Sequence, residues 1–365
     1  MGGGIQVAVS FIDEMSRMPV LPLGLAILVS EEVHANLQHV GSSVSKFHSY
    51  EVFNTYGLSA LWSGLGRKMR DIDIVFTVFG PLYQWSMQAV SIVGFAQAWI
   101  IYPNNKIYRS LPFLQKLKTR FKFFVHSLFF RRADRLVVEL EHAKNGLISR
   151  GFFDADKIDV IHNCLGSVYF HPEQWRPLSN SLAMKTFSIG FVGRDYPHKN
   201  TNILPEIKKF LQHVHKLDVD FYVTLNSTEW SGKSEVFRSN VINVGSLDVA
   251  QCPTFYQQMD AVIFPSFLEC FSATPLEAMA MKKPLFASDR GFVRDVCGDF
   301  AWYFDPEDPS AAAALIANYI NNKVGSDSVQ LAAAREHVIN FSSAPQRAAD
   351  YLRIIQAAVA SRNIV

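Results

Sequence analysis

Short apolar runs alternate with longer amphipathic segments along most of the chain. A run of about four to eight apolar or alternating residues between turn signals is typical of a strand. Such runs occupy residues 25–29, 74–78, 98–102, 133–138, 159–164, 187–193, 219–225, 241–245, 260–264, 284–287 and 300–304. Several segments between them, such as 58–69 and 141–149, have the length and polarity of helices. Strands that alternate with helices predict parallel sheets joined by crossover helices.

The length and one polar segment predict two domains. The chain has 365 residues, enough for two domains that each bury a core. Residues 171–185 are polar and punctuated by proline, so we interpret them as a linker between a first domain, 1–170, and a second domain, 186–340. Residues 341–365 carry a helical apolar stripe. The stripe consists of Ala348, Tyr351, Leu352, Ile355 and Val359.

Composition and charge narrow the class of protein. Hydrophobic residues make up 49% of the chain and charged residues 19%, which is typical of a globular protein. The formal net charge of +2 gives no basis for general binding to nucleic acid. The four cysteines lack the spacing of metal ligands or of a disulfide framework. We interpret them as free thiols in a reducing compartment, which favours a cytoplasmic location.

Residues 106–132 concentrate positive charge and aromatic rings. They hold eight Lys or Arg residues and no Asp or Glu. This pattern predicts a segment peripheral to an anionic membrane, at the inner face of the cytoplasmic membrane. Lys116, Lys118, Arg120 and Lys122 would then face the lipid headgroups. An alternative is a helix that packs its phenylalanines on the core and solvates its basic face. Nucleic acid is a weaker third alternative, because no recognised module accompanies the segment.

One stretch, residues 264–280, carries the clearest candidate chemistry. It follows the apolar run 260–264, passes through a turn of small residues and enters an amphipathic segment. We expect Thr274 to be the N-cap of a helix and Pro275 its first residue. Backbone N–H groups at such a helix start suit a phosphate. Glu269 and Glu277 flank the turn; an ordinary turn with two solvated glutamates is the alternative.

The same stretch resembles a known signature. Its pattern Pro-Ser-x-x-Glu-x-Phe-x-x-x-x-Leu-Glu-Ala-Met-Ala is similar to that of glycosyltransferase family 4, a group of retaining enzymes with the GT-B fold. The resemblance implies that Glu269 lies beside the donor sugar and Glu277 holds the nucleotide ribose. It also implies that the backbone of Ser272, Ala273 and Thr274 cradles the diphosphate. Cys270 and Ser272 depart from the family, which usually has glycine at both places.

Further segments carry the resemblance outside this stretch. Gly193, Arg194 and, five residues on, Lys199 resemble the family's Gly-Arg-x-x-x-x-Lys segment, which contacts the donor diphosphate. Breaking a sugar–phosphate bond develops negative charge on the leaving diphosphate, and fixed cations stabilise that charge. The loop through Ser246 resembles the segment that binds the nucleobase. Residues 160–164 resemble the family's Val-Ile-Pro-Asn-Gly; Asn163 fits this pattern.

The glycines at the start of the sequence resemble another family feature. Gly3 and Gly4 belong to a glycine run that precedes an amphipathic segment. Family 4 enzymes have such a loop between the first strand and the first helix, on the donor side. The strand is absent from the sequence as given, so we expect an apolar strand upstream. A flexible chain start is the alternative interpretation.

The resemblance implies a fold and a function together. The expected fold is α/β of the GT-B type, with two facing Rossmann-like, doubly wound domains and a C-terminal crossover helix on the first. The expected function is retaining transfer of a hexosyl unit from a nucleotide-sugar to a glycan or lipid-linked acceptor in cell-envelope polysaccharide synthesis. No cofactor or metal is expected, because no acidic motif suits one. A nucleotide-sugar epimerase and an inactive, membrane-docked binding protein are the alternatives.

Overall fold

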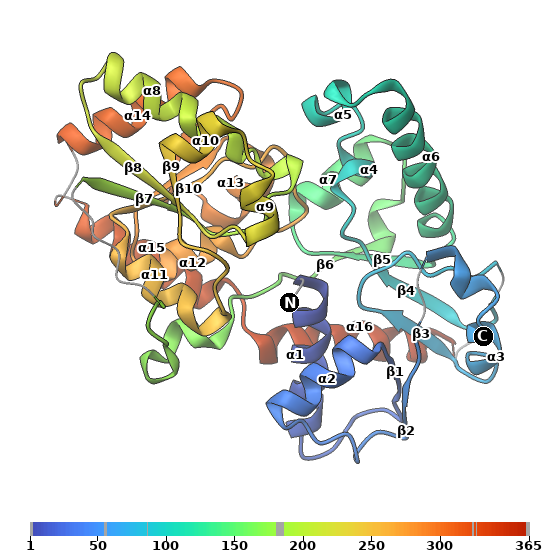
Figure 1. The fold of residues 1–365 in the computed structure, drawn as a ribbon. Coiled ribbons are helices and arrows are strands. Elements are labelled where there is room, and N and C mark those ends of the chain that lie inside the picture. Colours follow the sequence, from blue (N-terminus) through green and yellow to red (C-terminus); the bar gives the residue numbers. More distant parts are fainter. Residues whose placement is uncertain are drawn as a thin grey trace. The chain divides into compact units, whose positions relative to one another are not determined.

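The computed structural model describes residues 3–54, 57–85, 87–179, 186–322, 325 and 327–362, and the chain folds into two compact units. The first unit comprises Met1–Ile101, Pro112–Cys164 and Ser342–Val365. The second comprises Tyr102–Leu111 and Leu165–Phe341 (Figure 1). The start of the predicted linker, 171–179, belongs to the second unit, and residues 180–185 lie outside the described residues.

The second unit is built on one parallel sheet in the order β12-β11-β10-β7-β8-β9. Its strands are β7 (Phe187–Phe191), β8 (Val219–Val223), β9 (Val241–Asn243), β10 (Ala261–Phe264), β11 (Leu285–Ser288) and β12 (Trp302–Phe304). The chain winds outward from β7 in one direction and from β10 in the other. The strand order therefore reverses between β7 and β10. Ligands of open α/β sheets bind at this point, beyond the carboxyl ends of the strands.

The second unit contains the following α-helices. They are α5 (Lys106–Ser110), α8 (Leu204–His213), α9 (Ser227–Ser231), α10 (Glu235–Asn240), α11 (Cys252–Gln258), α12 (Thr274–Ala280), α13 (Gly291–Cys297), α14 (Pro309–Asn322) and α15 (Ser328–Phe341). Short 3₁₀ helices are η3 (Ser167–Phe170), η4 (Pro172–Gln174), η5 (Pro197–Lys199), η6 (Thr201–Ile203) and η7 (Val249–Gln251). Ile189 and Phe191 of β7 pack in the core with α8 and α14. Gly190, between them, faces α11, where an added Cβ would lie 2.6 Å from Met259 Cγ.

The first unit contains two parallel sheets. One has the order β3-β4-β5-β6 and the other pairs β1 with β2. These strands are β1 (Ala26–Val29), β2 (Ser49–Val52), β3 (Ile74–Thr77), β4 (Val90–Gly94), β5 (Arg135–Val138) and β6 (Ile158–Val160). The helices are α1 (Gly3–Arg17), α2 (Glu31–Val40), α3 (Leu65–Lys68), α4 (Ala98–Ile101), α6 (Phe113–Phe130), α7 (Glu141–Ser149) and α16 (Ala344–Arg362), with 3₁₀ helices η1 (Gly57–Leu61) and η2 (Ala155–Lys157).

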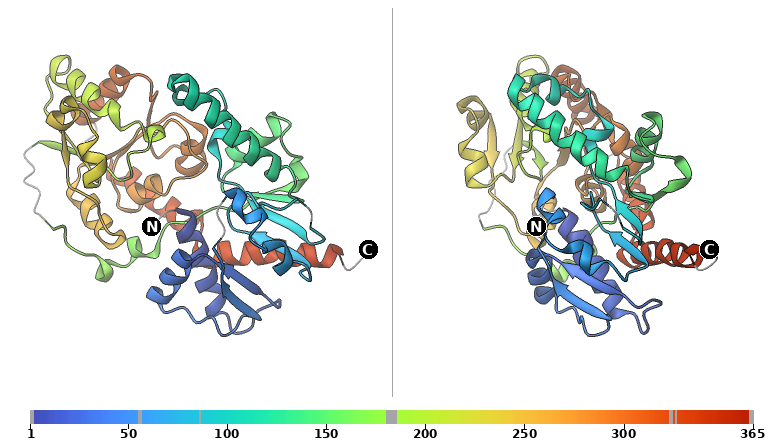
Figure 2. Two further views of the ribbon diagram at one scale, coloured as in Figure 1. Left: turned by 45° about the vertical axis from the view of Figure 1, so that its right-hand side comes forward. Right: turned by 90° about the vertical axis from the view of Figure 1, so that its right-hand side faces the viewer.

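A single apolar core joins the two sheets of the first unit to the end of the chain. Val29 of β1 and Ile92 of β4 belong to the same buried cluster as residues of α1 and α16. Tyr351 of α16 lies against Phe11 and Phe76, with ring centroids 5.1 and 4.9 Å away. Figure 2 shows α16, in red, alongside the strands of this unit. The C-terminal helix thus packs on the unit built mainly from the start of the chain, which confirms that part of the predicted fold.

Most predicted elements are present, but two were wrong. Residues 98–102 were expected to form a strand and instead contain α4, whereas the neighbouring strand β4 was missed. β4 and α4 both lie in one nearly continuous apolar stretch; β4 is mostly buried, and Ile100 and Ile101 of α4 are buried too. Periodicity does not separate a buried strand from a buried helix in such a stretch. Residues 58–69 were expected to form one helix, but they contain two short ones, η1 and α3.

Candidate functional site

The turn between β10 and α12 brings Glu269 against a lysine from another loop. Lys199 Nζ lies 2.5 Å from Glu269 Oε1, and the two side chains are only 12% and 10% exposed. Ser266 Oγ donates a hydrogen bond of 3.0 Å to the same carboxylate oxygen. Lys199 Nζ also lies 3.5 Å from Ser272 Oγ. Three residues predicted from two separate sequence motifs therefore meet beyond the carboxyl ends of β7 and β10.

Packing and a backbone hydrogen bond fix the two loops together. The ammonium of Lys199 lies 5.3 Å from the ring centroid of Phe264, the last residue of β10. Phe267 N donates to the carbonyl of His198 at 2.7 Å. Burial lowers the pKa of His198, although the nearby Glu269 raises it. Sequence reasoning missed His198, because its place in the site depends on the contact between two loops.

Gly193 and Arg194 begin the loop that carries Lys199. Gly193 has φ of 154°, a conformation that L side chains rarely adopt, and its N–H donates to Thr224 Oγ1 at 3.2 Å. The Arg194 side chain is 59% exposed and pairs with Glu229, whose Oε1 lies 2.5 Å from Arg194 Nε. That hydrogen bond raises the pKa of Arg194. Glu229 is a second residue that the sequence analysis missed.

Glu277 is held from inside the unit by tyrosines. Its Oε2 accepts a hydrogen bond of 2.7 Å from the Tyr256 hydroxyl. Burial raises the pKa of Glu277, while hydrogen bonds from Tyr256 and Tyr169 and the charge of Lys199 lower it. Both tyrosines are buried. They lie 21 and 108 residues before Glu277, so no local sequence signal could have found them.

The start of α12 corrects one expectation. The N-cap residue is Ala273, with φ −75° and ψ −24°, and Thr274 is already helical. The Thr274 hydroxyl does not cap the helix; it donates to the carbonyl of Val192 at 3.4 Å. This bond connects α12 to the end of β7, a long-range contact that competes with the local cap. Pro275 was expected to be the first helical residue and is instead the second, because the helix begins at Thr274.

The remaining residues predicted to bind the donor are Ser246, Gly3 and Gly4, and they are not part of the turn that carries Glu269. Ser246 is exposed on the loop that follows β9, at the edge of the sheet. Gly3 and Gly4 belong to the first unit, whereas Glu269 and Lys199 belong to the second. α1 begins at Gly3, so these glycines form the first turn of the helix and not a loop before it. The roles of Ser246, Gly3 and Gly4 toward a donor stay predictions.

The basic segment of the first unit turns an apolar face outward. Phe113, Leu117, Phe121, Phe124 and Leu128 of α6 are exposed, with Phe113 at 78% and Phe121 at 67%. They recur every three or four residues and so share one face of the helix. On the inner side Phe129 and Phe130 are buried, and Phe123 stacks on Trp99 at 5.6 Å. The alternative of a helix that packs its phenylalanines on the core therefore holds only for part of α6, because Phe113, Phe121 and Phe124 are exposed.

The described residues form neither a candidate membrane span nor a candidate metal site. Among the residues that the structure describes, no helix is both long and apolar enough to cross a membrane. The same residues contain no cluster of three or more His, Cys, Asp or Glu side chains that could hold a metal ion.

The geometry and the comparisons with solved structures agree on the fold. A glycosyltransferase from Rickettsia africae ESF-5 has a TM-score of 0.66 at 18% identity, covering 98% of this chain and 96% of that one. Anabaena Alr3699/HepE in complex with UDP-glucose has a TM-score of 0.65 at 15% identity, covering 99% and 96%. The chain has the GT-B fold. At these identities the likeness carries the fold alone.

Sequence comparisons support the prediction of a glycosyltransferase. Residues 233–337, which include Glu269 and Glu277, match the family model "Glycosyl transferases group 1". The chain is 28% identical over 174 residues to a D-inositol 3-phosphate glycosyltransferase of Mycolicibacterium gilvum, covering 44% of this chain and 38% of that protein. It is 23% identical over 229 residues to the O-antigen chain mannosyltransferase RfbU of Salmonella typhimurium, covering 61% and 60%. These alignments span about half the length of the curated relatives.

Proposed function

We propose that the protein is a retaining glycosyltransferase that moves a hexosyl unit from a nucleotide-sugar to a glycan or lipid-linked acceptor of the cell envelope. The observation that carries the proposal is the ion pair between Lys199 and Glu269, beside Ser272 at the switch point of the sheet. A cation for the diphosphate and a carboxylate for the sugar lie together there. The match to group 1 glycosyltransferases over residues 233–337 supports the same conclusion.

Each site residue has a chemical task in this proposal. The bond between the anomeric carbon and the diphosphate oxygen breaks, and the leaving diphosphate takes the electron pair. The acceptor's hydroxyl oxygen forms the new bond to the anomeric carbon, and its proton passes to the leaving diphosphate. Lys199 and Arg194 stabilise that charge, as a point charge and a forked guanidinium. Glu269 positions the sugar and stabilises positive charge on it, and Glu277 accepts hydrogen bonds from the ribose. We propose that the transfer needs no metal ion.

The experiment proceeds in two stages. Thermal unfolding is measured with a panel of nucleotide-sugars, because a ligand that binds the folded state raises the apparent stability. The donor that stabilises the protein is then radiolabelled and incubated with glycan and lipid-linked acceptors, with and without a chelator. Transfer of label with the anomeric configuration kept is the expected result, in both conditions. Recovery of an epimer, or binding without any turnover, would overturn the proposal.

We further propose that α6 docks the protein on an anionic membrane, where lipid-linked acceptors present their sugars. The outward apolar face of α6 would enter the headgroup region. Lys116, Lys118, Arg120 and Lys122 lie on the same helix as this face. α6 contains no Asp or Glu, so its charge complements anionic lipid.

A further inference from the structure

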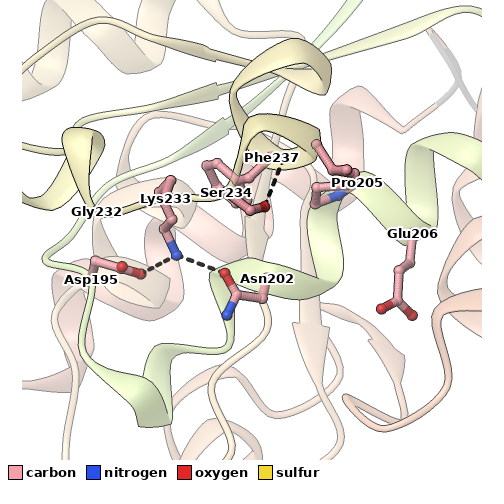
Figure 3. Close-up of a pocket in the computed structure, with 9 residues that line it drawn as sticks. Asp195, Asn202, Pro205, Glu206, Gly232, Lys233, Ser234 and Phe237 are labelled. Atoms are coloured by element: carbon pink, nitrogen blue, oxygen red, sulfur yellow. Dashed lines mark hydrogen bonds and ion pairs between the residues drawn. The ribbon is translucent and has the colours of Figure 1, made fainter.

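A buried lysine lies behind the loop that carries Arg194 and Lys199. Lys233, between α9 and α10, is only 7% exposed. Its ammonium lies 2.7 Å from Asp195 Oδ1, 2.7 Å from Thr201 Oγ1 and 2.8 Å from Asn202 Oδ1 (Figure 3). It also lies 4.5 Å from the ring centroid of Phe237. An ammonium has three N–H donors, and each has an oxygen partner here.

These contacts close the loop on itself. Asp195 stands at the start of the segment 195–202, and Thr201 and Asn202 stand at its end, with Lys199 between them. The Thr201 hydroxyl donates to Asp195 Oδ1 at 2.5 Å, so Lys233 completes a ring of polar contacts across the two ends. Asn200 Nδ2 donates to the carbonyl of Pro306 at 2.9 Å, which fixes the same end to a third segment.

The same part of the chain holds Arg194 as well. Glu229 of α9 accepts hydrogen bonds from Arg194 Nε and, at 3.2 Å, from the backbone N–H of Asp195. Glu229 is itself fixed by a capping box with Asn226 at the start of α9. The residues from Glu229 to Lys233 therefore hold the loop at two points, one beside each cation that the proposed reaction uses.

We propose that Lys233 is a positioning residue that holds the loop 193–202 so that Lys199 and Arg194 point at the donor diphosphate before it binds. This inference rests on the proposed function for the identity of the ligand. Cations that are fixed in advance need no reorganisation when negative charge develops. Without Lys233 the loop loses the holding point beside Lys199 and keeps the one at Glu229, so Lys199 is then less precisely oriented. Lys233 acts through the loop and needs no contact with the substrate.

The test compares two lysines of the second unit that each pair with an aspartate. Lys233→Met keeps the length of the apolar stem and removes the charge. The control is Lys208→Met, since Lys208 Nζ lies 2.9 Å from Asp220 Oδ1 in the same unit, outside the loop 193–202. Affinity for UDP, GDP and ADP is measured by calorimetry, and amide exchange of the peptide 193–202 by mass spectrometry. Thermal unfolding of each protein is recorded alongside.

We expect Lys233→Met to weaken binding of the preferred nucleoside diphosphate by roughly tenfold or more and to speed exchange in 193–202. Lys208→Met should lose a similar amount of thermal stability but leave nucleotide affinity and amide exchange in 193–202 unchanged. A pocket of about 360 Å³ adjoins Lys233 and is lined by Asn202, Glu206 and Val236 among others. Lys233→Ala should therefore be rescued in part by added n-butylamine, which a general loss of folding would not permit.

Unchanged exchange and affinity in Lys233→Met would overturn the inference, as would equal effects of the two lysine substitutions. If Lys233→Met does not fold, Lys233→Met/Asp195→Asn removes the unpaired carboxylate, and the same outcomes apply to it. Failure of the wild type to bind any of the three nucleotides would count against the proposed function. In that case the exchange rates without ligand still decide whether Lys233 holds the loop.

Discussion

Among individual residues, the two cations differ in burial, and this difference gives separate expectations. Arg194→Ala and Lys199→Ala should each lower turnover by roughly a hundredfold, as the loss of one transition-state donor does. Lys199→Ala should also lower the melting temperature, because it leaves the shielded carboxylate of Glu269 without its ion-pair partner. Arg194→Ala should not, since that side chain is mostly exposed. Initial rates and thermal unfolding check both, with exposed Lys209→Ala as the control.

Substitution of Glu269 and of Glu277 should affect different kinetic quantities. Glu277→Ala should mainly weaken nucleotide affinity, because contacts with the ribose stabilise ground and transition states alike. Glu269→Ala should mainly lower the turnover rate, because the proposed role of Glu269 is to position the reacting sugar and to stabilise the positive charge on it. Calorimetry with the nucleoside diphosphate, next to steady-state kinetics, separates the two effects. Equal losses of nucleotide affinity in both variants would contradict these assignments.

The hydroxyl of Tyr256 should control how nucleotide binding depends on pH. Burial raises the pKa of Glu277, and the hydrogen bond from Tyr256 opposes this by stabilising the anion. In the proposed function the ionised carboxylate accepts hydrogen bonds from the ribose, so affinity should fall as the pH falls through this raised pKa. Tyr256→Phe removes the stabilisation and should move the loss of affinity to higher pH.

Calorimetry of the nucleoside diphosphate across the acidic range measures this shift. Tyr319→Phe is the matched control, because its hydroxyl donates to Asp327 Oδ2 at 2.5 Å, also buried in the second unit. The control should lose stability and keep the wild-type pH profile. A wild-type profile in Tyr256→Phe would show that the tyrosine does not act through Glu277.

Among the secondary-structure elements, α6 makes its own prediction. The protein should sediment with anionic vesicles at low salt and be released by high salt, since attraction to the surface is screened over about 8 Å at physiological ionic strength. Changing Lys116, Lys118, Arg120 and Lys122 together to Gln should abolish this binding, because each basic residue contributes about 1 kcal/mol near such a surface.

The apolar face of α6 adds a second expectation. Phe121→Ser and Phe124→Ser keep the charge and remove two exposed rings, so binding should weaken at every salt concentration. Vesicles of neutral lipid are the control, and binding to them should stay weak for all variants. If the unaltered protein ignores anionic vesicles at low salt, α6 is not a membrane element and a soluble acceptor is favoured.

For the molecule as a whole, one buried arginine ties the last helix to the first unit. The guanidinium of Arg347, 3% exposed, donates to Asn163 and, at 2.9 Å, to Ser10 on α1. Asn163 Nδ2 in turn donates to Glu139 Oε1 at 2.7 Å. Arg347→Ala should lower the free energy of unfolding by about 3 kcal/mol, because it leaves this buried network incomplete. Denaturant unfolding measures the change, and Arg353→Ala, on the exposed side of α16, should stay within about 0.5 kcal/mol of the wild type.

Sequence pattern by itself predicted the fold class and named the central residues of the candidate site. The local periodicity of apolar residues indicates whether a segment is a strand or a helix, so most strands, and helices such as α7, could be predicted. Glu269, Glu277, Arg194 and Lys199 could be named because their spacing within short motifs carries the resemblance. Whether residues 89–101 form a strand or a helix was decided only by packing. Strand β4 and helix α4 are both apolar and both contribute buried residues, so their local patterns look alike.

Tertiary structure alone decided which side chains support that site. Glu229, Lys233, Tyr256 and Tyr169 come from segments far from their partners, and no local pattern marks a contact between such segments. The N-cap of α12 is a case of the same kind, since Thr274 bonds to Val192 across the sheet and not to its own helix. Local periodicity follows from the geometry of one element. A hydrogen bond between elements depends on how the whole unit packs, and the sequence does not display that directly.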